Sequence, residues 1–387
     1  MIEFLSPVSQ DVLEFRKKLP LGTLGEKINI HSKKGELPNF KNVKFAILGL
    51  KENRTDVETN DENICFDSYR KAFYSLYPGN WNYRIVDLGD IERGATPEDS
   101  RFAAKETIAA LLNIKVIPLI LGASQDLAYG QYRAYDRIGN MVNMVNVDSR
   151  FDLGNADLPI SNKSYVGKMV VDLPYNLFNY SVIGYQSFFN APSEIALMDK
   201  LYFDAYRLGE VSADVKVVEP IMRDADIVTI DATAIKGAEI CYNNNKSPNG
   251  FDGREICAIS RYAGISNRVS SFGIYEIGKD MYHLSGAMLI AQVFWYFVEG
   301  VNFRIEDEDF ENEDQFTSYS VPIEETVLTF KKSNRTERWW ILMPFISDVN
   351  NKLKRRTLLP CTYDDYLGAC NQQIPERWLK ACHKNEV

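Results

Sequence analysis

The feature that most constrains the fold is a series of short, nearly continuous apolar runs separated by longer amphipathic segments. A run that is apolar at every position indicates a strand buried on both faces of a sheet. Helices between such strands provide the crossovers that parallel strands require. The predicted strands are residues 45–49, 83–88, 116–121, 141–147, 226–230 and 269–275, and residues 89–90 read as a turn after the second. The predicted helices are residues 67–76, 97–113, 126–135, 253–263 and 282–298.

This alternation predicts an α/β fold of three layers, α/β/α, with a mainly parallel sheet. We place this domain at residues 45–300, after an N-terminal extension at 1–44. The C-terminal extension, 301–387, changes character. It contains an acidic run at 306–314 that we interpret as a surface loop, a hairpin formed by 326–331 and 338–343, and short amphipathic helical segments from residue 361.

Composition excludes several classes of protein. The net charge of −9 argues against a nucleic-acid binder, which needs a basic face. No apolar segment follows a basic start, so no signal peptide is expected. The longest uncharged apolar stretch, 284–298, is too short for a membrane span and predicts a buried helix. The six cysteines include no CxxC pair and no zinc-ligand spacing, which indicates free thiols and a cytoplasmic location.

Polar residues gather where the apolar runs end. In open parallel sheets, ligands bind outside the carboxyl ends of the strands. Four such ends carry five carboxylates, which suggests a site, although each Asp could instead cap the following helix. The segments are Gly122-Ala-Ser-Gln-Asp126, Asp148-Ser-Arg-Phe-Asp152, Asp231-Ala-Thr-Ala-Ile-Lys236 and Glu276.

In order, spacing and strand context, these segments resemble the arginase, agmatinase and formimidoylglutamase family. They stand where that family has GGDHS, DAHxD, SxDxDxxDP and a substrate-side Glu. Residues 87–90 also fit the pattern, and 178–209 resemble the formimidoylglutamase branch in particular. The resemblance covers residues 45–300. It implies an arginase-like fold and hydrolysis of a guanidino or formimino C–N bond by a manganese-bridging hydroxide.

The departures from the family pattern bear on function. The resemblance implies six metal ligands, of which three remain, Asp148, Asp152 and Asp231. Gln125 and Arg150 replace the two His ligands. Thr233 replaces the fourth Asp ligand, and Lys236 replaces a nearby family Asp.

These replacements weaken the site for metals. A guanidinium has no lone pair to donate and stays protonated, so Arg150 cannot ligate a metal. Its charge is expected to lie where the second metal would be, or to pair with two of the aspartates. Three Asp charges and one Arg leave about −2, which suits one divalent ion at most. We therefore expect no tightly bound metal, with one Mg²⁺, Mn²⁺ or Ca²⁺ on Asp148, Asp152 and Asp231 as the alternative.

The leading hypothesis is a pseudoenzyme that keeps the fold, has lost the hydrolase reaction and acts as a binding or scaffold protein. An amidine C–N hydrolase that uses a single divalent ion is the alternative, so enzymatic activity stays open. A serine hydrolase is a third reading, because Gly122–Asp126 resembles a nucleophile elbow around Ser124. It would need a late histidine, and His283 and His383 are the candidates.

A partner protein, if there is one, is expected to bind outside the family core. The features that could serve are the acidic run 306–314, a basic cluster and the Trp339-Trp340 pair, of which one ring is expected to face outward. The resemblance also implies homo-oligomers. We expect no nucleic-acid partner. The basic cluster consists of Lys352, Lys354, Arg355 and Arg356.

Overall fold

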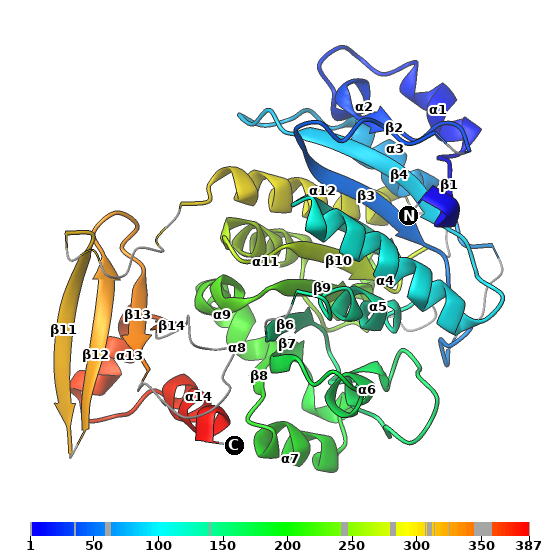
Figure 1. Ribbon diagram of the computed structural model, residues 1–387. Coiled ribbons are helices and arrows are strands. Elements are labelled where there is room, and N and C mark those ends of the chain that lie inside the picture. The colour runs from blue at the N-terminus through cyan, green and yellow to red at the C-terminus, as the bar shows by residue number, and fades with distance from the viewer. Residues whose placement is uncertain are drawn as a thin grey trace.

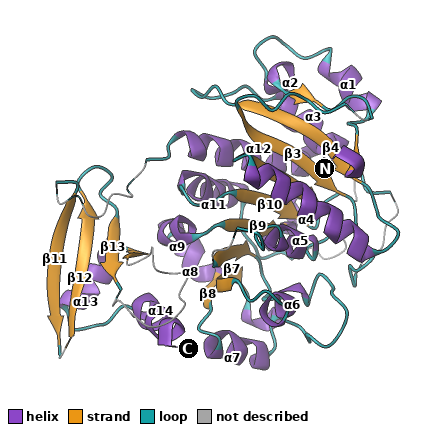
Figure 2. Ribbon diagram, in the orientation of Figure 1, coloured by secondary structure: helices purple, strands orange, loops and turns teal. Residues whose placement is uncertain are grey.

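The computed structural model describes residues 2–34, 36–58, 63–138, 141–240, 247–278, 284–305, 307, 312, 314–324, 326–343 and 358–386. These residues form one large sheet flanked by helices and a second, smaller sheet near the C-terminus (Figure 1). Figure 2 shows the helices on both sides of the large sheet.

The large sheet has ten strands and is mainly parallel, as predicted. Its strands are β1 (Leu5–Ser6), β2 (Asn29–Ile30), β3 (Val43–Leu50), β4 (Arg84–Ile91), β5 (Ile117–Gly122), β6 (Val142–Val147), β7 (Leu177–Tyr185), β8 (Asp204–Arg207), β9 (Ile227–Asp231) and β10 (Ser271–Tyr275). Their order is β1-β4-β3-β5-β10-β9-β6-β7-β8, with β2 also paired to β4. Of these pairings, that of β1 with β4 is antiparallel.

All six predicted strands are present, but β4 does not end at residue 88. It continues through Gly89 and Asp90 to Ile91, because the N-terminal strand β1 pairs with this extra length. Gly89 has φ +77°, and a Cβ there would lie 2.0 Å from the Ser6 carbonyl oxygen. Glycine is therefore required where β1 and β4 approach each other closely. The prediction of a turn at residues 89–90 is wrong. Through β1 and β2, the N-terminal segment extends the sheet.

Two apolar cores occupy the two faces of the sheet. Helices α3, α9, α11 and α12 cover one face, and α4, α5 and α6 cover the other. The five predicted helices correspond to α3, α4, α5, α11 and α12, although residues 282–283 lie outside the described part. The helices of this domain are α1 (Gln10–Arg16), α2 (Leu24–Lys27), α3 (Asp67–Ser75), α4 (Pro97–Asn113), α5 (Leu127–Arg133), α6 (Tyr165–Val171), α7 (Pro192–Lys200), α8 (Leu208–Ala213), α9 (Val218–Asp224), α10 (Gly237–Ile240), α11 (Gly253–Ile265) and α12 (Leu284–Asn302).

Helix α12 is a core helix, as its uncharged sequence predicted. By length and composition it could cross a membrane, but 61% of its most apolar window is buried inside the molecule. Phe297 of α12 stacks on Phe272 of β10, with ring centroids 4.2 Å apart. The apolar character of α12 is therefore explained by packing against the sheet.

A buried ion-pair network ties α3 to β4. The Arg70 guanidinium, 1% exposed, donates to Asp87 Oδ2 at 2.9 Å and to Asp90 Oδ1 at 2.7 Å. Removing one partner of a buried pair leaves an uncompensated charge. We expect Arg70→Met to lower the free energy of unfolding by about 3–5 kcal/mol, measured by urea denaturation. Arg84→Met, at an exposed arginine of β4, is the control. If both variants lower the free energy of unfolding equally, the buried network does not stabilise the fold as proposed.

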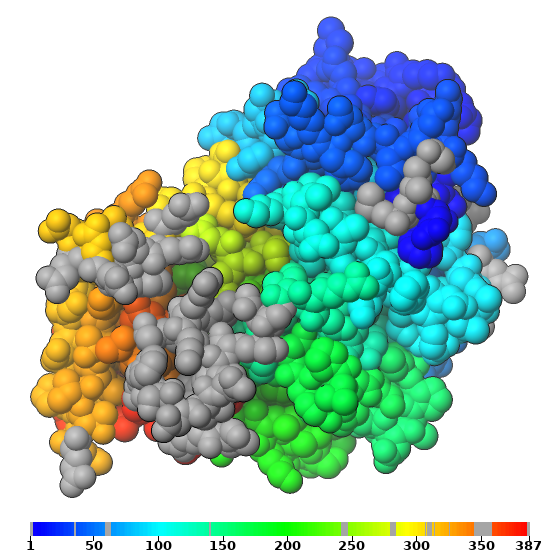
Figure 3. Space-filling view, viewed as in Figure 1, coloured from blue at the N-terminus to red at the C-terminus, as the bar shows by residue number. Residues whose placement is uncertain are grey.

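The C-terminal extension forms a four-stranded antiparallel sheet. The predicted hairpin is confirmed, because β12 pairs with β13 across residues 333–338, and β11 and β14 add a strand on each side. In Figure 3 this sheet lies on the opposite side of the molecule from the N-terminal segment. Its elements are β11 (Phe316–Ile323), β12 (Thr326–Ser333), β13 (Trp339–Leu342), β14 (Leu358–Cys361), α13 (Tyr363–Cys370) and α14 (Glu376–Glu386).

Both tryptophans of β13 are buried, at 7% and 5% exposure, so the expectation of one outward-facing ring is wrong. Alternation does place Trp339 and Trp340 on opposite faces, but both faces are covered. Trp339 stacks on Tyr366 of α13, whereas Trp340 lies under the Arg223 guanidinium of α9 at 4.6 Å. Arg223 also donates to the carbonyls of Trp339 and Cys361, which attaches the small sheet to the α/β domain.

Two predicted features of this region lie mostly or wholly outside the described residues. Most of the acidic run 306–314 lies outside the described residues. Of its described members, Asp307 is buried and accepts a hydrogen bond from Ser333 Oγ. The basic cluster 352–356 also lies outside the described residues.

Candidate active site

The carboxyl ends of the four central strands meet at one edge of the large sheet. Strands β5, β10, β9 and β6 are consecutive neighbours and run in the same direction. Gln125 follows β5, Asp148 follows β6, Asp231 ends β9 and Glu276 follows β10. The sheet thus brings together side chains that are up to 151 residues apart, as the ends of the apolar runs predicted.

Three of these side chains form a compact cluster. Carboxylate oxygens of Asp148, Asp152 and Asp231 all lie within 4.8 Å of one another. The three residues are 0%, 3% and 0% exposed. Asp152 and Glu276 have left-handed backbones, with φ of 52° and 58°. Non-glycine residues adopt this conformation at a cost that the surrounding structure must offset, and such residues are often functional.

Burial raises the pKa of every carboxyl in this cluster, and the neighbouring carboxyls raise it further. The pKa of Asp152 rises to about 7. That of Glu276 rises to about 8, with Asp231 and Asp56 adding to the effect of burial. The pKa of Asp148 lies well above its ordinary range, because burial and the charges of Asp231 and Asp152 all favour the protonated form. The positive charge near the cluster is therefore too small to keep all of its carboxyl groups ionised.

Lys163 is a member of the site that sequence reasoning missed. It lies in the loop before α6, and its ammonium opposes the rise in pKa at Asp148, Asp152, Asp231 and Glu276. Burial alone would lower the pKa of Lys163, but the four carboxylates raise it above its ordinary value. No described ion pair includes Lys163, so its charge acts across the site without direct contact.

The neighbouring Asn162 holds this loop over the cluster. Its Nδ2 donates to Glu276 Oε1 and to Asp56 Oδ1, both at 3.1 Å, and its Oδ1 accepts from the backbone N–H of Val57 at 3.2 Å. The position of Lys163 is therefore fixed by a buried amide. In the sequence, Lys163 stands among polar loop residues and reads as a solvated lysine, so only the fold reveals it.

Arg150 does not lie where it was expected. Its guanidinium donates to the Phe189 carbonyl at 2.8 Å and stacks over the Phe189 ring at 4.7 Å. Only its backbone N–H reaches the cluster, donating to Asp148 Oδ1 at 2.9 Å. Arg150 is therefore not between Asp148 and Asp231, and the expectation that it takes a metal's place is wrong. An aromatic ring and a free carbonyl nearby satisfy the guanidinium without the cost of burying it.

Gln125 is held beneath the cluster by a buried polar network. Its Nε2 donates to Asn146 Oδ1 at 3.0 Å and to the Tyr165 hydroxyl at 3.1 Å. Asn146 in turn donates to Asp148 Oδ2 at 3.0 Å. The backbone N–H of Gln125 donates to Glu276 Oε1 at 2.9 Å. Strand β6 thereby connects Gln125 with Asp148.

The cluster can accommodate one metal ion. Four buried oxygen atoms there have no hydrogen-bond donor: Gln125 Oε1, both carboxylate oxygens of Asp152, and Asp231 Oδ2. Buried oxygens without donors are uncommon and fit a cation ligand set. An all-oxygen set suits Mg²⁺, Mn²⁺ or Ca²⁺. The residues do not fit two ions, because Arg150 cannot ligate and the Thr233 backbone N–H occupies Asp231 Oδ1 at 2.6 Å.

The serine at the apparent nucleophile elbow has a structural role. Ser124 Oγ donates to Asp126 Oδ1 at 2.5 Å, and Arg101 pairs with the same carboxylate at 2.7 Å. His383 stacks on Tyr202 in the C-terminal part of the molecule, and His283 lies outside the described residues. Of the two candidate histidines, the described one therefore does not contact Ser124.

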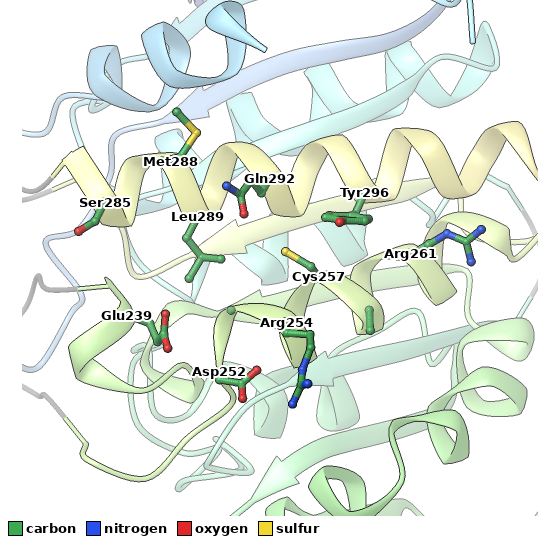
Figure 4. Close-up of a pocket in the computed structure, with 12 residues that line it drawn as sticks. Glu239, Asp252, Arg254, Cys257, Arg261, Ser285, Met288, Leu289, Gln292 and Tyr296 are labelled. Atoms are coloured by element: carbon green, nitrogen blue, oxygen red, sulfur yellow. The ribbon is translucent and has the colours of Figure 1, made fainter. Parts of the chain in front are cut away.

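A separate groove lies away from the cluster. This groove, of about 810 Å³, lies between α11 and α12. Figure 4 shows residues that line it, among them Cys257, Leu289 and Tyr296. No cluster residue lines this groove. Lys236, which replaces a family Asp, approaches Asp252 at its edge at 3.9 Å. Lys236 therefore belongs to the surroundings of the groove.

The fold and the cluster together define an α/β/α protein with a carboxylate site at the carboxyl edge of a parallel sheet. The model of the Arginase family matches residues 51–298, and the chain belongs to that family. The resemblance stated from the sequence motifs is thus confirmed.

Several formimidoylglutamases are among the proteins to which the chain is similar. The formimidoylglutamase of Streptococcus gordonii (strain Challis) is 21% identical over 263 residues, which cover 62% of this chain and 80% of that protein. The structure of Bacillus subtilis formimidoylglutamase matches with a TM-score of 0.62 at 15% identity, over 70% of this chain and 91% of that one. Trypanosoma cruzi formiminoglutamase with Mn²⁺ matches with the same TM-score and identity, over 70% and 97%. These structural likenesses show the shared fold.

Proposed function

We propose that this arginase-family chain has lost two-metal hydrolysis and serves as a binding or scaffold protein. The observation that carries the proposal is the position of Lys163, in a loop that Asn162 anchors to Glu276 and Asp56, where its charge acts on all four carboxylates of the site. An ammonium there offsets part of the negative charge that would otherwise require metal ions. The fold can then keep its buried aspartates without a metal pair.

The ligand set supports the same conclusion. Gln125 and Thr233 offer neutral oxygens, and the Arg150 guanidinium points to Phe189. Lowering the pKa of a water molecule to form hydroxide is the task of the metals in such sites. No described histidine lies at the cluster to serve as a base in their place.

A second candidate function is hydrolysis of an amidine C–N bond with one divalent cation. The four buried oxygens without donors favour it. Asp148, Asp152, Asp231 and Gln125 would hold the ion, which would supply Lewis acidity at the cluster. Glu276, held by Asn162 and the Gln125 backbone, would face the substrate side.

The binding role is proposed for the C-terminal extension, since the family match ends at residue 298. Tyr363, 52% exposed, belongs to the aromatic stack of Trp339 and Tyr366 and offers an exposed ring. Self-association, a protein partner and a cytoplasmic location are part of the proposal. The five cysteines of the described residues form no disulfide, which accords with a reducing compartment.

Metal analysis and an activity panel test the proposal. Purified protein dialysed against Mn²⁺ is expected to retain at most one equivalent and to show no hydrolysis of formiminoglutamate, agmatine or arginine. The S. gordonii formimidoylglutamase, assayed alongside, is the positive control. Turnover with one equivalent of metal would favour the second candidate, and turnover with two would overturn the proposal.

A further inference from the structure

A separate cavity lies at the opposite end of the large sheet from the carboxylate cluster. It has a volume of about 300 Å³ and is bounded by the residues that precede or begin β6, β7 and β8, by α6, and by the C-terminal helix α14. Figure 1 shows α14 beside β8 and α7. Helix α14, which contributes Lys384 to the wall, lies beyond the family match at residues 51–298.

The wall of the cavity is apolar and aromatic, with two cations and no carboxylate. Its lining residues are Met141, Met169, Val170, Tyr175, Leu177, Phe178, Lys200, Leu201, Tyr202, Phe203 and Lys384. Small-molecule sites typically combine such an apolar wall with a few placed polar groups. Here the placed polar group is an ammonium.

Lys384 is partly buried in this wall. Its Nζ lies 5.5 Å from the Phe178 ring centroid and 5.7 Å from that of Phe203, and it donates to Asn179 Oδ1. An ammonium has three donors, so two are left without an oxygen acceptor among the described residues. Burial lowers the pKa of Lys384 to about 8, which keeps the group mainly protonated at neutral pH.

The acidic groups near Lys384 are already paired with other cations. Asp204 Oδ1 lies 3.5 Å from Lys380 Nζ, and Asp224 Oδ1 lies 3.1 Å from Arg268. Lys384 itself has no ion-pair partner among the described residues. A partly buried cation with open donors beside an apolar cavity is complementary to an anion with an apolar body.

We propose that this cavity binds a small monocarboxylate whose apolar body fills it and whose carboxylate pairs with Lys384. An apolar cavity of about 150 Å³ holds one benzene molecule, so this one has room for about twice that volume. A medium-chain fatty acid or a ring bearing a short acid chain fits this space. The site is independent of the carboxylate cluster and of the proposed function.

Calorimetric titration of the full chain with octanoate tests the proposal, with octanol and octylamine as uncharged and cationic probes of equal length. Octanoate is expected to bind at one site at least about 10-fold more tightly than octanol, and octylamine not to bind. Lys384→Met is expected to remove the preference for octanoate over octanol, whereas Lys384→Arg retains it. Lys200→Met, at the exposed edge of the cavity, is the matched control and is expected to change affinity by less than about 3-fold.

Val170→Trp leaves Lys384 in place and fills the cavity, so it is expected to abolish binding of both octanoate and octanol. Thermal unfolding of each variant establishes that it is folded. Equal affinity of octanoate and octanol, unchanged octanoate binding in Lys384→Met or Val170→Trp, or no saturable binding at millimolar octanoate would each overturn the proposal.

Discussion

Replacing Lys163 with methionine is expected to tighten the binding of one divalent cation at Asp148, Asp152 and Asp231 by about 10-fold or more. The Lys163 ammonium acts on the same buried carboxylates that would bind a metal cation. The two positive charges therefore repel each other, which raises the energy of the bound cation. Two unit charges about 6 Å apart interact by about 3 kcal/mol at an effective dielectric constant near 20. Methionine keeps the length and apolar stem of the side chain and removes that repulsion. Calorimetric titration of chelator-treated protein with Mn²⁺ at neutral pH measures the effect.

Lys163→Arg is the matched control, because it keeps the charge and should bind Mn²⁺ no more tightly than the unaltered protein. Asp152→Asn in the Lys163→Met background should abolish the gain, since it removes a carboxylate from the ligand set. If Lys163→Met and the unaltered protein bind Mn²⁺ equally, the ammonium does not compete for the cluster.

Restoring the missing ligands is expected to raise the Mn²⁺ content from at most one equivalent to two. The variant combines Gln125→His, Arg150→His and Thr233→Asp with Lys163→Met. Histidine supplies neutral nitrogen donors, and the added aspartate provides a fourth carboxylate against two divalent charges. The backbone of residue 150 already contacts Asp148 at 2.9 Å, so a shorter side chain at that position can face the cluster. Metal analysis after removal of unbound Mn²⁺ measures the equivalents.

The same combination without Arg150→His is the control and should remain at one equivalent. Hydrolysis of formiminoglutamate by the fully restored variant would show that the rest of the site is intact. If the restored variant binds only one equivalent of Mn²⁺, then the backbone, as well as the missing ligands, prevents binding of the second metal ion.

Much of the site could be predicted because its backbone positions depend on local patterns. Apolar runs locate the strands, and a polar residue after a buried parallel strand lies at the carboxyl edge wherever the strand sits in the sheet. Asp148, Asp231 and Glu276 were found in this way. The direction of a long side chain does not follow from such local patterns. Arg150 has several rotamers of similar energy, and the Phe189 ring and carbonyl select one that points away from the cluster.

The sequence by itself determined the layered α/β fold, because strands and helices follow from local periodicity. The resemblance of its ordered motifs to those of the arginase family indicated the family and the three aspartates that remain. The tertiary structure alone decided which cation faces those aspartates. A loop anchored by Asn162 brings Lys163 over the cluster, while the expected Arg150 turns to Phe189. It also decided that both tryptophans of β13 are buried, because α13 and Arg223 come from elsewhere in the chain to cover the two faces of that sheet. Contacts between distant segments have no local signature, since they depend on which surfaces the folded chain brings together.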